Sequence, residues 1–136
     1  MRVLKAGEII RARTHADLLN ELFGTNYKAW MKCTYPYSYD SFVWMVRFNE
    51  VNKSTGWENV EISPNYVIEK NHNGILTFEG GSVTEILADK RIVFQIVGDG
   101  VFRKYIFKGI YKYDNSKGNP ILERYLKKID DKIIIK

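Results

Sequence analysis

From residue 41 onward, the sequence pattern has a period of two residues, which is typical of β-strands. The clearest segments are Ser41–Phe48, Ile92–Val97 and Val101–Tyr113, all rich in β-branched and aromatic side chains. Turn residues such as Gly98-Asp99-Gly100 separate them. No alternation of strands with helices is present, so a doubly wound parallel sheet is not expected.

One helix is predicted ahead of these strands, over His15–Phe23. Thr14 is a good N-cap, and Gly24 stands where a left-handed C-cap residue belongs. A second short helix is expected over Asn26–Lys32. One face of the first helix carries Leu18, Leu19, Leu22 and Phe23.

Further short strands complete the predicted fold, which is α+β and mainly β. It consists of a bent antiparallel sheet or a small barrel, with one or two short helices near the N-terminus. Gly109 lies inside a long strand and indicates a bulge that could exchange its faces. Ser82–Arg91 and Leu122–Ile129 each fit a helix or a strand. The short strands are expected at Glu8–Arg13, Asn59–Ile62, Tyr66–Glu69 and Lys132–Ile135.

The length of 136 residues fits a single domain over 1–136, either alone or within a longer protein. Cys33 is the only cysteine, which excludes an internal disulfide and a zinc site built from several cysteines. No apolar run reaches the ~18–20 residues that span a bilayer, and no secretory signal is present. We therefore expect a cytoplasmic protein with no membrane partner.

Positive charge is concentrated at the C-terminal end of the chain. Ten Lys and Arg against four Asp and Glu give Arg103–Lys136 a charge of +6, while the preceding 102 residues carry −1. Such asymmetry indicates a basic face that binds an anionic partner, most commonly nucleic acid. A lysine-rich surface that only confers solubility is the alternative.

Signatures of catalysis are absent from the sequence. It contains no glycine-rich phosphate loop and no Gly-x-Ser-x-Gly elbow. The two histidines, His15 and His72, have no metal-ligand spacing. We expect no catalytic residue, no metal and no cofactor, and binding is favoured over enzymatic activity.

Aromatic residues around the first long strand form the candidate base pocket. Tyr35, Tyr37 and Tyr39 alternate, so an extended backbone places them on one side. Flat rings with a carboxylate acceptor can hold an extruded base. The alternative is that these rings pack over the end of a barrel. The pocket candidates are Trp30, Tyr37, Tyr39, Asp40, Trp44 and Trp57.

Lysines at every fourth position of Val101–Tyr113 are the candidate phosphate contacts. In a regular strand they project in a row that can follow a nucleic-acid backbone. Lysines that protect a sheet edge from pairing are the alternative. The full set is Lys104, Lys108, Lys112, Arg124, Lys127 and Lys128.

The late strands, from Gly98-Asp99-Gly100 through Phe102–Tyr111 to Arg124–Ile129, resemble those of the PUA-like superfamily. The order of strand, short helix and bent sheet with aromatic-rich loops is similar as well. This superfamily includes the SRA, YTH and EVE readers of modified bases. The resemblance implies a PUA-like barrel that binds modified DNA or RNA, in a prokaryotic restriction or defence context.

The leading hypothesis is therefore a nucleic-acid-binding module that reads a modified base in DNA or RNA. A protein-interaction module, such as a phage or mobile-element accessory protein, is the second hypothesis, with exposed aromatics as interface anchors. A small metal-dependent hydrolase or nuclease that uses Glu61, Glu69 and His72 is the third. Those three side chains must converge for the third hypothesis to hold.

Overall fold

A computed structural model describes residues 1–72, 89–116 and 123–135 of the chain. Most of the ambiguous segment 82–91 lies outside these residues. The elements in chain order are β1 (Arg2–Lys5), β2 (Ile9–Arg11), α1 (His15–Phe23), β3 (Thr34–Ser38), β4 (Ser41–Val46), β5 (Trp57–Ser63), β6 (Tyr66–Asn71), β7 (Lys90–Val97), the short 3-10 helix η1 (Gly100–Phe102), β8 (Lys104–Tyr113), β9 (Glu123–Asp130) and β10 (Lys132–Ile135).

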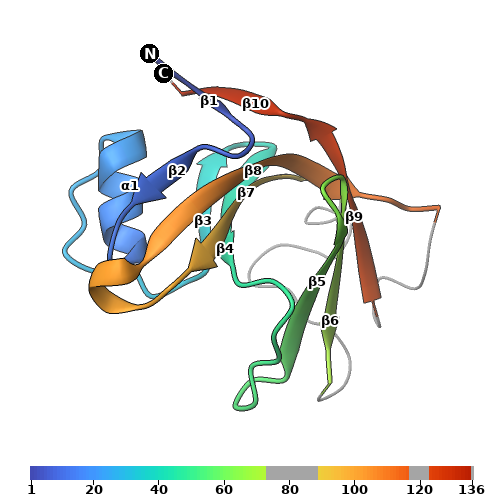
Figure 1. Cartoon of the computed structure of the whole chain (residues 1–136). Helices are drawn as coiled ribbons and strands as arrows, with labels where there is room; N and C mark the ends of the chain where they lie inside the picture. Colours follow the sequence, from blue (N-terminus) through green and yellow to red (C-terminus); the bar gives the residue numbers. More distant parts are fainter. Residues whose placement is uncertain (73–88, 117–122, 136) are drawn as a thin grey trace.

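One bent sheet in the order β3-β4-β7-β8-β9-β6-β5 forms the body of the molecule (Figure 1). β2 pairs with β8, and β1 pairs with β10 in a separate ribbon that brings the two chain ends together. Within the described residues, β3 and β5 do not pair, so the sheet stays open and does not close into a barrel. The predicted α+β, mainly β class is confirmed.

One strand pair departs from the predicted antiparallel arrangement. β4 and β7 run parallel, with Val43 opposite Ile92 and Met45 opposite Phe94. Parallel neighbours need a long crossover connection, and the chain between β4 and β7 includes the β5–β6 hairpin. The periodicity of the sequence indicates which segments form strands, but not which distant strands pair. It therefore did not predict this crossover.

Helix α1 begins and ends as predicted. The Asp17 amide donates to Thr14 Oγ1 at 3.1 Å, and Gly24 takes the left-handed conformation with φ of 67°. The second helix predicted over Asn26–Lys32 is wrong, because this segment is irregular. Trp30 instead packs against Tyr27 and Tyr35, so tertiary aromatic contacts determine its conformation. No helix in the described ranges is long and apolar enough to cross a membrane.

The sheet has two hydrophobic faces. We call the side covered by α1 and the β1–β10 ribbon the helix face. We call the opposite side the network face, after the network of charged side chains described below. Alternation along β4 sends Val43 and Met45 to the helix face, and Trp44 and Val46 to the network face. The helix face also buries Leu18, Leu19, Phe94, Tyr105 and Phe107, whereas the network face buries Val67, Val93, Tyr111 and Leu126.

A bulge in β8 exchanges the faces of that strand. Val93 lies opposite Gly109 and Phe94 lies opposite Phe107, so Lys108 is the extra residue. Before the bulge, Phe107 packs on the helix face; after it, Tyr111 packs on the network face. Gly109 has a φ of +123°, which L side chains rarely adopt. The bulge anticipated at Gly109 is therefore present, and it divides the aromatic stripe between the two faces.

Candidate nucleic-acid interface

A buried network of three charged side chains lies on the network face. Arg91 donates to both carboxylate oxygens of Glu69, at 3.1 and 3.2 Å, and Arg124 donates to Glu69 Oε1 at 2.9 Å. Their exposed fractions are 4% for Arg91, 7% for Glu69 and 2% for Arg124. Within the described residues, two guanidinium groups share this one carboxylate.

Neighbouring strands position this network. Glu69 on β6 stands directly opposite Arg124 on β9, and Arg91 on β7 stands opposite Tyr111 on β8. The guanidinium of Arg91 lies over the rings of Trp44 and Phe42, 4.8 and 5.3 Å from their centroids. These cation–π contacts and the bidentate pair with Glu69 hold Arg91 in one orientation.

The ionisation of Glu69 depends on its two partners. Burial alone would raise the pKa of Glu69, but Arg91 and Arg124 together hold this pKa below its usual value. Burial lowers the pKa of Arg124, and the carboxylate of Glu69 opposes that effect. Glu69 is therefore ionised at neutral pH, as the shared partner of two buried guanidinium groups.

Other polar groups extend the network face beyond these three residues. Asn59 on β5 stands opposite Glu69, and its buried Oδ1 has no hydrogen-bond partner within the described part of the chain. Lys108 Nζ pairs with Glu61 Oε2 at 2.9 Å, and Lys128 Nζ lies 5.7 Å from the ring centroid of Tyr111. A buried acceptor without a donor is rare and indicates a place where a ligand can donate.

The structure does not bring the six base-pocket candidates together. Trp30 and Tyr37 belong to an aromatic cluster beside α1, where the ring centroids of Tyr37 and Phe23 are 5.2 Å apart. Tyr39 and Asp40 form the turn between β3 and β4, and Tyr39 is 97% exposed. Trp44 is buried under Arg91, and half-buried Trp57 begins β5. Of the six, Trp44 is in direct contact with the charged network.

The phosphate-contact candidates divide into surface and interior residues. Arg124 is buried in the network, and Lys108 is paired with Glu61. Lys128 is largely buried and pairs with Asp131 at 3.3 Å. These three side chains are committed to contacts within the protein. The side chains of Lys104, Lys112 and Lys127 remain partly or fully exposed.

The exposed lysines are not all on one face. After the bulge, Lys112 on β8 stands directly opposite Lys90 on β7 and Lys127 on β9, the two neighbouring strands. We call these three residues the lysine row. Each follows or precedes a residue of the network face, so the row lies on the other side of the sheet. Lys90 pairs with Asp40 at 3.4 Å, which places the β3–β4 turn at one end of the row.

The residues of the predicted hydrolase site have separate partners. Glu61 pairs with Lys108, Glu69 lies in the arginine network, and His72 Nε2 is 2.8 Å from Glu58 Oε1. Within the ranges that the structure describes, no group of three metal-ligating side chains is present. The geometry therefore gives no support to a shared catalytic centre.

Arg91 was not among the predicted site residues, and Glu69 was assigned to a different function. One signal was available, because Glu69 follows Val67 at a spacing of two in a predicted strand and so points to the same buried face. A charged residue at an apolar position of a strand requires a buried partner. The sequence alone did not show which arginines supply it.

Comparisons with known proteins identify the family. The family model for SRA, the SET and RING associated domain, matches residues 2–135. No curated protein matched the chain. Among solved structures, the chain is similar to the 5-hydroxymethylcytosine-specific restriction enzyme AbaSI, with 22% identity and a TM-score of 0.69 over 96% of this chain and 42% of that one. The chain belongs to the SRA family, the PUA-like modified-base readers that bind DNA.

Proposed function

We propose that the chain recognises a modified cytosine in DNA, and that the network face holds the base-reading site. The observation that carries this proposal is the buried Arg91–Glu69–Arg124 network, with the guanidinium of Arg91 over the rings of Trp44 and Phe42. AbaSI is named for 5-hydroxymethylcytosine, which makes a cytosine modified at its 5-position the first candidate. The chain covers 42% of the length of AbaSI. The proposal therefore concerns base recognition, and restriction is only the context in which such recognition would act.

Recognition on this face would combine stacking with hydrogen bonding. Glu69 holds the two arginines, and the N–H groups of Arg91 that do not bind Glu69 can donate to a base oxygen or a hydroxyl. The unpartnered Oδ1 of Asn59 can accept from an amino group or a hydroxyl of the base. Half-buried Phe42, beneath Arg91, offers a ring for stacking. In a desolvated site, one unmatched polar group is enough to reject the wrong base.

The test is binding to a panel of short labelled duplexes with cytosine, 5-methylcytosine or 5-hydroxymethylcytosine, with single strands and RNA added. We expect one modified duplex to bind best. Asn59→Ala should reduce this preference about tenfold, the effect of one lost hydrogen bond in a buried site. Binding of the unmodified duplex should change little.

Asn65→Ala is the matched control, since Asn65 lies in the exposed β5–β6 turn. It should leave the preference unchanged. Equal binding of all duplexes by the unaltered protein would contradict base reading. An unchanged preference for the modified duplex in the Asn59→Ala variant would show that Asn59 does not contact the base. Preference for RNA would contradict DNA as the target, and failure to bind any nucleic acid would favour the protein-interaction hypothesis.

The lysine row is proposed to contact the phosphate backbone. Like charges directly opposite on neighbouring strands are destabilising, so Lys112 and Lys127 gain stability when an anion lies between them. Exposed Tyr39 lies in the adjoining turn, where it precedes Asp40, the ion-pair partner of Lys90. Lys104 is a separate candidate at the other end of β8.

The double variant Lys112→Ala/Lys127→Ala is expected to weaken binding to every duplex alike. The slope of log K against log salt should become shallower by about 2, one unit for each lost phosphate contact. Fluorescence polarisation at several salt concentrations measures the slope. Lys5→Ala/Lys132→Ala, on the β1–β10 ribbon, is the control with the same charge change. An unchanged slope would exclude the lysine row from the DNA interface.

A further inference from the structure

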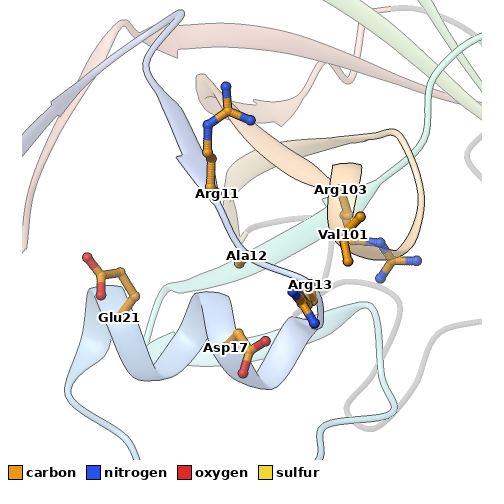
Figure 2. A pocket seen from close by; sticks show the side chains of 7 residues that line it. All are labelled: Arg11, Ala12, Arg13, Asp17, Glu21, Val101 and Arg103. Atoms are coloured by element: carbon orange, nitrogen blue, oxygen red, sulfur yellow. The ribbon is translucent and has the colours of Figure 1, made fainter.

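A second feature with ligand-binding character lies where β2, α1 and the segment after η1 meet. It is an open pocket of about 350 Å³ (Figure 2). Its walls share no residue with the charged network or the lysine row. The lining residues are Arg11, Ala12, Arg13, Asp17, Glu21, Val101 and Arg103.

Three arginines line this pocket, and none of them has a carboxylate partner in the described part of the chain. No ion pair within 4.0 Å joins Arg11, Arg13 or Arg103 to any acidic group of the described residues. Arg103 has a buried Nε with no hydrogen-bond partner in the same part of the chain. In Figure 2, Arg13 and Arg103 lie on the same side of the pocket, and Arg11 extends from β2 above it.

The two lining carboxylates have other roles. Glu21 is within 3.4 Å of Arg2, which lies outside the pocket. Asp17 is in the first turn of α1, where a negative charge stabilises the helix and where its amide completes the N-cap. Neither carboxylate therefore satisfies the guanidinium groups, and an excess of positive charge remains at the pocket.

Neighbouring residues add to this positive field. Lys104 stands directly opposite Arg11 on the adjoining strand, although like charges in that position repel one another. Burial lowers the pKa of His15 to about 4, and the charges of Arg103 and Arg47 contribute to this shift. His15 is therefore neutral at pH 7, held beside Tyr105 by a 2.7 Å hydrogen bond.

We infer that this pocket is a phosphate-binding site. Guanidinium groups bind phosphate oxygens through paired N–H donors, and a buried Nε without an acceptor is such a donor awaiting its partner. The ligand is a phosphate group, either the diester of a nucleic-acid backbone or the monoester of a free nucleotide. This inference goes beyond base reading, because the pocket is made by different elements from the network face.

The test is a titration of the isotope-labelled protein with inorganic phosphate at constant ionic strength, followed by NMR. We expect saturable shifts of the amide signals of Ala12, Asp17 and Val101. The bound anion should also raise the pKa of His15, because it offsets the field of Arg103. Two results would overturn the inference: amide shifts that do not saturate, or shifts of similar size at residues next to surface lysines throughout the protein.

The double variant Arg11→Gln/Arg13→Gln should weaken phosphate binding on the order of tenfold or more, as expected for lost charge-assisted hydrogen bonds. Both side chains are exposed, so the fold should be retained. Lys5→Gln/Lys132→Gln removes the same charge from the β1–β10 ribbon and should bind phosphate normally. Equal weakening in both variants would show only general charge attraction and would overturn the site.

Two competitors distinguish the sources of the phosphate. Displacement of inorganic phosphate by a short unmodified duplex supports a backbone phosphate as the ligand. Displacement by adenosine monophosphate but not by the duplex supports a free nucleotide. The Asn59→Ala variant separates the two proposals, since it should lose base preference and keep phosphate binding. Phosphate binding that survives Arg11→Gln/Arg13→Gln would overturn this site and leave base reading untouched.

Discussion

Replacing Glu69 with glutamine is expected to lower the free energy of unfolding by about 3–5 kcal/mol, the range for breaking a buried ion pair from one side. The change leaves Arg91 and Arg124 buried, with exposed fractions of 4% and 2%, and removes the carboxylate that they share. One amide oxygen cannot replace the three hydrogen bonds that the carboxylate accepts. Urea unfolding at pH 7 measures the difference.

Glu58→Gln is the matched control for this substitution. Glu58 also has two basic partners, Lys70 at 3.4 Å and His72 at 2.8 Å, but it lies at the surface of the β5–β6 hairpin. Exposed pairs of this kind contribute little to stability, because water and salt screen them. Equal losses in the two variants, or a loss for Glu69→Gln within the ~0.5 kcal/mol typical of surface substitutions, would show that the buried network is not a major source of stability.

The same network predicts how stability depends on pH. The folded pKa of Glu69 lies below its ordinary value of 4.5, so the unfolded state binds the proton more readily. The contribution of Glu69 is therefore fully present above the unfolded pKa and is lost as the pH falls through the folded pKa. The Glu69→Gln variant should lack this acid-dependent component, and a series of urea unfolding curves below about pH 5 tests it.

Replacing Gly109 with alanine is expected to cost about 2–3 kcal/mol of folding free energy, from backbone strain and a steric clash together. A φ of +123° is strained for any L side chain, which costs about 1–3 kcal/mol. The added Cβ would also lie 2.7 Å from the backbone oxygen of Asp130 and 3.0 Å from the Lys128 side chain. A backbone oxygen in a paired strand cannot move away cheaply, so β8 and β9 must separate locally.

Gly7→Ala is the control for the substitution in the bulge. Gly7 also has a positive φ, of +98°, but a Cβ added there would meet no heavy atom within 4 Å. The variant should show the conformational strain without the steric clash, and so a smaller loss of stability. Thermal or urea unfolding of both variants gives the comparison. A Gly109→Ala variant as stable as Gly7→Ala would mean that the bulge relaxes without a penalty.

The helix and most strands could be predicted because their signals are local. Thr14 and Gly24 mark the ends of α1, and the periods of Ile92–Val97 and Lys132–Ile135 give strands at those positions. The ambiguous segment near the C-terminus is the strand β9, and β3 was missed because Thr34–Ser38 resembles a loop rich in tyrosine. Strand β3 is stabilised by its pairing with β4, a tertiary contact that the local pattern of Thr34–Ser38 does not indicate.

The candidate site was harder to predict than the fold. Aromatic residues that are close in sequence, such as Tyr37 and Trp44, lie on opposite faces of the sheet. The predicted row of lysines in β8 requires a regular strand. The bulge instead places Lys112 on a different face from Lys104. The role of Arg124 changed for a similar reason, because its partner Glu69 lies 55 positions away.

The sequence by itself determined the class of fold, the position of α1 and the surplus of positive charge, since periodicity, capping and composition act locally. Only the tertiary structure decided the parallel β4–β7 pair and the burial of Arg91 and Arg124 around Glu69. These features depend on contacts between distant segments. Their stability comes from burial and pairing across the sheet, which no local pattern encodes.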